Sequence, residues 1–178
     1  SASTAEIDSS DEVVVFVPAT EVGCFGVHLP NQGTAELRRS AAFALEDDLA
    51  VPVEDAHVAI GQPLPDGSRP VHIVDPALME QWVAILNTAG LKTARLVADA
   101  SILPVTPVAV DAGTHILFSV SGRRFAVDAQ LPDDALKAFA NKSETPVIAS
   151  GDELARRLGG AAAQSTSLPL LGQLAQWA

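Results

Sequence analysis

The sequence contains one cysteine, few basic residues and no long apolar run. The single cysteine, Cys24, excludes an internal disulfide and a metal site built from a cysteine cluster. The 11 Lys and Arg residues are outnumbered by 22 Asp and Glu residues, which gives a formal charge of -11. That charge would repel the phosphate backbone of nucleic acids and anionic lipid headgroups. We therefore predict no nucleic-acid partner.

No apolar run reaches the roughly 20 residues that a membrane-spanning helix needs. The first residues also lack the basic and apolar regions of a signal peptide. What the chain does have is 48% apolar residues among 178, the composition of a folded globular protein. Residues 1–12 are small, polar and acidic, which predicts a disordered leader. We expect a soluble, acidic domain whose order begins near Val13.

The first half of that domain alternates strand and helix patterns. The β-branched run 13–17 predicts a strand buried on both faces, with residues 24–29 as its hairpin partner. Thr34 is placed to cap a helix whose apolar positions repeat at helical spacing as far as Leu49. This helix should end before Pro52.

A second hairpin and a second helix follow. Residues 56–60 and 71–74 predict two strands around a turn that contains proline and glycine. Asp75 and Pro76 predict a helix start, and Gly90 predicts its stop. One stripe of apolar residues lies along this helix: Leu78, Met79, Trp82, Ile85 and Leu86.

The remainder predicts further short strands and helices of an α/β fold. The predicted elements are strands 95–97 and 105–110 around a helical turn at 99–101, a hairpin of 115–120 and 124–127, helix 133–139, strand 146–149 and helix 152–158. Mixed sheets flanked by helices are therefore expected.

Two groups of acidic residues could carry chemistry. Asp111 opens the turn Asp-Ala-Gly-Thr between two predicted strands, and actin-like folds and sugar kinases hold Mg²⁺ and phosphate on turns of this kind. A second aspartate turn and a Gly-rich loop are not evident, so an ordinary β-turn is the simpler interpretation. Glu46, Asp47 and Asp48 are consecutive carboxylates, which point in different directions on a helix and favour a solvated or partner-facing surface over a metal site.

The histidines and the cysteine form no catalytic pattern. His28, His57, His72 and His115 each fall in a predicted strand and have no metal-ligand spacing. Cys24 has apolar neighbours, which favour a small buried side chain over a nucleophile. We therefore predict no catalytic residue, no cofactor and no metal site, hence a protein that is not an enzyme.

Several consecutive segments carry a resemblance to one family. They are the strand 13–18, the helix 39–50 with its sequence Ala-Leu-Glu-Asp, the turn and strand 53–61 with Val-Glu-Asp and a histidine, and the segments 74–82 and 91–100. Together they resemble the cytoplasmic domain of type II secretion system protein L.

The resemblance implies an actin-like fold of two RNase H-type lobes without nucleotide hydrolysis. Residues 13–104 would form the first lobe with an inserted hairpin subdomain, and residues 105–178 the second, which ends at a pre-membrane segment over 170–177. The family's first strands have no counterpart before Val13, so we expect a truncated version of the fold. The domain would lie at the cytoplasmic face of the bacterial inner membrane and be anchored through a segment that this chain does not contain.

The resemblance also implies partners. They are the amino-terminal domain of the secretion ATPase and the inner-membrane platform protein M, and the domain would act as a scaffold between them. Glu46, Asp47 and Asp48 are the candidate docking residues, and a homodimer paired through an exposed sheet edge is a further interpretation. Two alternatives stay open: an actin-like ATPase that binds nucleotide at Asp111, and a related pilus-assembly scaffold.

Overall fold

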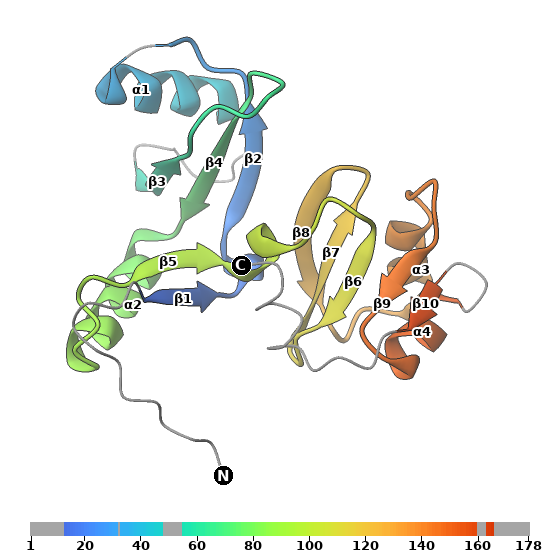
Figure 1. Ribbon diagram of the computed structural model, residues 1–178. Helices are drawn as coiled ribbons and strands as arrows, with labels where there is room; N and C mark the ends of the chain where they lie inside the picture. Colours follow the sequence, from blue (N-terminus) through green and yellow to red (C-terminus); the bar gives the residue numbers. More distant parts are fainter. Residues whose placement is uncertain (1–12, 32, 48–54, 160–162, 166–178) are drawn as a thin grey trace.

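The computed structural model describes residues 13–31, 33–47, 55–159 and 163–165 (Figure 1). The elements are β1 (Val14–Val17), η1 (Ala19–Glu21), β2 (Gly23–Val27), α1 (Thr34–Leu45), β3 (His57–Ile60), β4 (Arg69–Val74), α2 (Pro76–Thr88), β5 (Arg95–Ala98), η3 (Asp99–Ile102), β6 (Val108–Asp111), β7 (His115–Val120), β8 (Arg123–Asp128), α3 (Asp133–Ala140), β9 (Val147–Ala149), α4 (Asp152–Leu158) and β10 (Ala163–Ser165). Among the described residues, no helix is long and apolar enough to cross a membrane. The predicted leader and the predicted pre-membrane segment lie outside these residues.

A parallel strand pair with one helix begins the first lobe. β1 pairs with β5 over four residues, and α2 precedes β5 in the chain. The Asp75 carboxylate accepts a hydrogen bond from the Leu78 amide at 3.0 Å, and Pro76 occupies the first turn of α2. Gly90 follows the helix with φ +76°, a conformation that suits glycine. The helix start and stop predicted from the sequence are confirmed.

The prediction for the first strand is wrong in two respects. Val17 is the only buried residue of β1, and Phe16 remains 36% exposed, because β1 pairs with β5 alone among the described strands. β2 is not its hairpin partner but pairs with β4. The 3-10 helix η1 turns the chain between them, and the Ala19 amide donates to the Asp99 carboxylate 80 positions away, a contact that local sequence patterns do not reveal.

A three-stranded antiparallel sheet, in the order β2-β4-β3, lies between β1 and β5 in the chain, where the inserted subdomain was predicted. The predicted hairpin of β3 and β4 is confirmed. α1 covers one face of this sheet, where Ala41 and Leu45 pack against Val71 and Ile73 (Figure 1). Gly33, not Thr34, is the N-cap of α1, and the Gly33 amide donates to the Glu36 carboxylate at 3.3 Å. Leu49 lies outside the described residues.

The second lobe is a five-stranded mixed sheet with the order β10-β9-β6-β7-β8. Three antiparallel strands, β6, β7 and β8, are followed by β9 and β10, which continue the sheet in parallel, an RNase H-type arrangement. α3 and α4 pack on one face, where Phe118 stacks on Phe125 with ring centroids 5.4 Å apart. β6 begins at Val108, three residues later than predicted, and Val105 before it is 74% exposed.

One apolar core joins the two lobes. Val17, Ala100 and Leu103 of the first lobe lie in the same buried cluster as Val110 and Leu117 of the second. The lobes are therefore packed together. The predicted boundary between them, at residues 104 and 105, stays a prediction.

Candidate functional site

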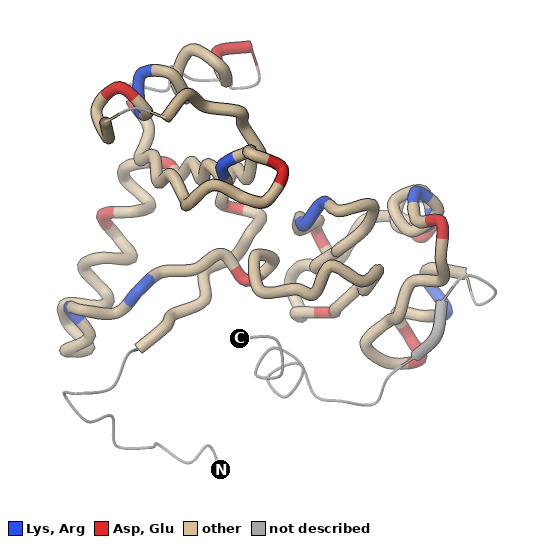
Figure 2. Tube along the Cα trace, turned by 45° about the horizontal axis from the view of Figure 1, so that its top comes forward, with Lys and Arg blue, Asp and Glu red and all other residues tan. Residues whose placement is uncertain are grey.

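The predicted docking residues lie at the end of α1. Glu46 is the C-cap of this helix, and both Glu46 and Asp47 are exposed; Asp48 lies outside the described residues. Figure 2 shows this acidic end, coloured red, at the point where the described chain breaks off. Carboxylates at a helix C-terminus oppose the helix dipole, so local helix stability does not account for them.

An apolar side chain accompanies these carboxylates. Phe43 is 83% exposed, the largest exposed fraction among the large apolar side chains of the described residues. It lies in the last turn of α1, and Glu46 and Asp47 follow directly after the helix, so the three residues lie together at its C-terminal end. All three are exposed, whereas Ala41 and Leu45 are buried against the sheet. We call Phe43, Glu46 and Asp47 the α1 patch; sequence reasoning proposed its acidic residues and did not single out Phe43.

The Asp111 turn has the geometry of an ordinary turn. The Asp111 carboxylate accepts a hydrogen bond from the Gly113 amide at 2.7 Å, and Gly113 has φ +91°. The Asp111 amide in turn donates to the Ser150 hydroxyl at 2.7 Å. The bond from the Gly113 amide to the Asp111 carboxylate is that of an Asx turn, which agrees with the simpler interpretation, an ordinary turn.

His57 and His72 line one pocket, but the other two histidines and Cys24 are not among its lining residues. Within the described ranges, no three His, Cys, Asp or Glu side chains are grouped as metal ligands. His28 follows β2 instead of lying in a strand. Cys24 was expected to be buried and is exposed, although partial burial of its thiol and the nearby Asp99 carboxylate raise its pKa.

A buried polar network at the junction of the lobes was not foreseen. His115 Nε2 lies 2.6 Å from Asp99 Oδ2, and both residues are buried. The other carboxylate oxygen, Asp99 Oδ1, accepts from the Ala19 amide at 2.9 Å. Thr114 Oγ1 lies 3.0 Å from His115 Nδ1. The network ties η1 and η3 of the first lobe to β7 of the second.

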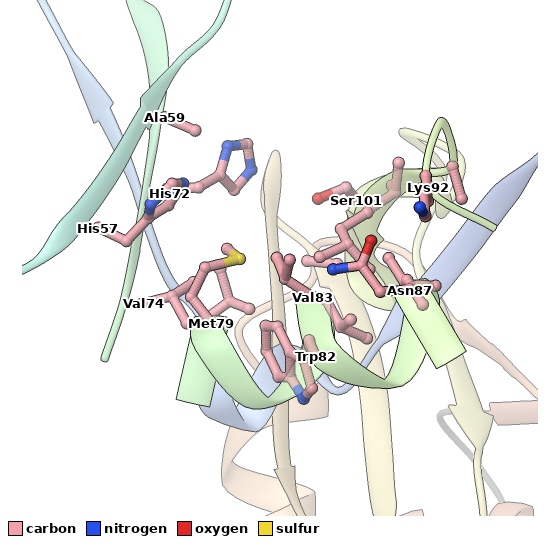
Figure 3. Close-up of a pocket in the computed structure, with 17 residues that line it drawn as sticks. His57, Ala59, His72, Val74, Met79, Trp82, Val83, Asn87, Lys92 and Ser101 are labelled. Atoms are coloured by element: carbon pink, nitrogen blue, oxygen red, sulfur yellow. The ribbon is translucent and has the colours of Figure 1, made fainter. Parts of the chain in front are cut away.

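A half-open groove of about 380 Å³ lies between the face of the hairpin sheet and α2 (Figure 3). Val74, Met79, Trp82, Val83 and Leu86 form much of its apolar lining. Figure 3 shows His57 and His72 on the sheet side and Asn87, Lys92 and Ser101 on the other. Burial lowers the pKa of His72. The groove has no signal in the sequence, because β4, α2 and β5 meet only in the folded chain.

Comparison with known proteins identifies the family. The family described as type II secretion system protein L matches residues 2–169. Type II secretion system protein L of Pseudomonas aeruginosa is 38% identical over 90 residues, which cover 51% of this chain and 24% of that protein. The protein of the same name from Pectobacterium carotovorum subsp. carotovorum is 30% identical over 154 residues, 84% of this chain and 35% of that protein.

A solved structure supports the fold. It is the cytoplasmic domain of EpsL, an inner membrane component of the type II secretion system of Vibrio cholerae. The TM-score is 0.67 at 22% sequence identity, over 94% of this chain and 74% of that one. The fold is therefore the actin-like α/β fold of that domain, as predicted. The chain spans about a quarter to a third of the length of these curated relatives. This chain belongs to the type II secretion system protein L family.

Proposed function

We propose that this domain is a non-catalytic scaffold that holds the amino-terminal domain of the secretion ATPase at the cytoplasmic face of the inner membrane. Through the rest of its protein it would join that ATPase to the membrane platform, where protein M is the expected neighbour. Membership in the protein L family supports a role in the secretion machinery. The observation that carries the docking proposal is the α1 patch.

The α1 patch combines the two features that a docking surface needs. Phe43 offers a large, exposed apolar side chain, and buried aromatic anchors supply much of the affinity of protein interfaces. Glu46 and Asp47 add negative charge beside it, which speeds association and selects basic partners. We infer that the ATPase domain meets this patch with an apolar pocket bordered by Lys or Arg.

The first test changes the patch and measures ATPase binding. Phe43→Ser should weaken binding of the ATPase amino-terminal domain at least ~10-fold, because aromatic anchors often carry that much affinity. Reversal of Glu46, Asp47 and Asp48 to Lys should also weaken it, chiefly through slower association. Surface plasmon resonance measures both the affinity and the association rate.

A control reverses two exposed acidic residues elsewhere. Asp134→Lys with Glu144→Lys changes the net charge in the same sense on the second lobe, by two reversals against three, and should leave ATPase binding within about twofold. If the patch variants and this control bind alike, the α1 patch is not the docking surface.

The nucleotide alternative makes an opposite prediction. A ligand of the native state raises its stability, so an ATPase that used Asp111 would show a higher Tm with millimolar ATP and Mg²⁺. We expect the Tm to change by less than ~1 °C, because the described residues include no group of three His, Cys, Asp or Glu side chains that could hold the metal ion beside Asp111. A clear rise in Tm that Asp111→Asn abolished would favour a nucleotide-binding protein over the scaffold.

A further inference from the structure

The groove between the hairpin sheet and α2 presents an open apolar surface. Along β4, Val71 and Ile73 pack toward α1, whereas the alternate residues His72 and Val74 line the groove on the opposite face. Val83 on the α2 wall is 44% exposed. Apolar side chains gathered in an open groove are typical of a binding surface.

The α2 wall has the shape of a helix-packing surface. Met79, Trp82, Val83, Leu86 and Asn87 line the groove, at successive helical spacings of three, one, three and one. Such a stripe is one face of a helix and accepts the ridges of a second helix. Since the side chains of a sheet face form the opposite wall, the groove would hold its occupant through side chains and not through free strand backbone. A volume of about 380 Å³ compares with the roughly 150 Å³ that holds one benzene ring, so two or three apolar side chains fit.

The charged side chain that lines the groove favours an occupant of negative charge. Lys92 lines one end, and none of the described residues that line the groove is Asp or Glu. Lys92 would pair with a carboxylate on an occupant and repel a basic one.

We propose that this groove binds an amphipathic helix of a partner protein, whose apolar face packs against α2 and whose acidic residue pairs with Lys92. It is a second docking surface, separate from the α1 patch. The inference rests on the proposed function only in taking the domain to work through protein contacts. The occupant is defined by its chemistry: apolar residues at positions i, i+3, i+4 and i+7, with a carboxylate at one end.

A designed peptide tests the proposal directly. The probe is a fluorescein-labelled, alanine-rich peptide of about 18 residues, long enough to form a helix, with four leucines at that spacing and one Glu beside them. A matched peptide carries Lys in place of Glu. Fluorescence anisotropy should show saturable binding of the Glu peptide to the wild-type chain, at least ~5-fold tighter than binding of the Lys peptide.

Variants of α2 and of Lys92 locate the binding. Val83→Glu, which places a charge inside the groove, should weaken binding of the Glu peptide at least ~10-fold. Ile85→Glu is the control, since Ile85 lies on the same helix, is 64% exposed and does not line the groove. Lys92→Glu should reverse the preference, so that the Lys peptide binds more tightly than the Glu peptide. Urea unfolding of each variant shows whether it remains folded.

Three results would overturn the proposal: no saturable binding of either peptide, equal effects of Val83→Glu and Ile85→Glu, or no change of preference in Lys92→Glu. Binding of the ATPase domain is measured with the same variants. If Val83→Glu no longer binds the peptide but still binds the ATPase domain, the groove serves another partner and the proposed function is unaffected. If the α1 patch variants still bind the ATPase domain as the wild type does, the proposed docking surface is wrong, whereas the peptide result remains valid.

Discussion

Asp99→Ala is expected to lower the free energy of unfolding by roughly 3 kcal/mol, because it leaves two buried polar groups without their hydrogen-bond partner. The Asp99 carboxylate accepts from the Ala19 amide at 2.9 Å and lies 2.6 Å from His115 Nε2. Both contacts are at the junction of the lobes, where water cannot readily replace the lost oxygen atoms. Urea unfolding followed by circular dichroism measures the loss.

Asp99→Asn is the matched control for this prediction. Its amide oxygen can still accept from the Ala19 amide, and its NH₂ group can donate to a neutral His115 ring. The expected loss is therefore about 1 kcal/mol or less. Equal stability of Asp99→Ala and wild type would mean that the network does not hold the lobes together.

Phe118→Ala should cost about 3–5 kcal/mol, the range for a fully buried phenylalanine. Phe118 has no exposed surface and lies against two other aromatic rings, with centroids 5.4 Å away for Phe125 and 5.9 Å for Phe139. Removing its ring leaves a cavity beneath α3 and α4 that the remaining side chains fill only in part. Thermal or urea unfolding measures the loss.

Phe43→Ala provides the contrast within the same chain. Its side chain is 83% exposed, so the same substitution should change stability by no more than about 0.5 kcal/mol. A destabilisation comparable with that of Phe118→Ala would show that Phe43 packs against the domain, which would remove it from the α1 patch. Retained stability with weaker ATPase binding is the expected combination.

Local signals in the sequence predicted the elements whose contacts are close in the chain. α2 has its cap at Asp75, proline in its first turn and Gly90 at its end, and the β3–β4 hairpin has a turn rich in proline and glycine. These features act within a few residues, so one sequence is enough to read them. The α1 patch was predicted in part: the sequence analysis named Glu46 and Asp47 as docking residues but did not name Phe43.

Contacts between distant residues were not predictable in this way. β1 pairs with β5, whose residues lie 81 positions further along, and no local pattern names that partner. The same holds for Asp99 and Ala19. It also holds for the groove, which is lined by residues of β1, β3, β4, α2, β5 and η3. Which distant segments pair depends on the apolar surface that the whole fold buries and on the entropy cost of closing the loop between them. The composition of either segment alone does not reveal the pairing.

We propose that this domain works by binding the secretion ATPase and performs no nucleotide chemistry. Calorimetric titration with the amino-terminal domain of the cognate ATPase, beside a control titration with ATP and Mg²⁺, tests it most directly. We expect saturable binding of the ATPase domain at a stoichiometry near one and no heat of binding from the nucleotide. Binding of nucleotide without binding of the ATPase domain would contradict it.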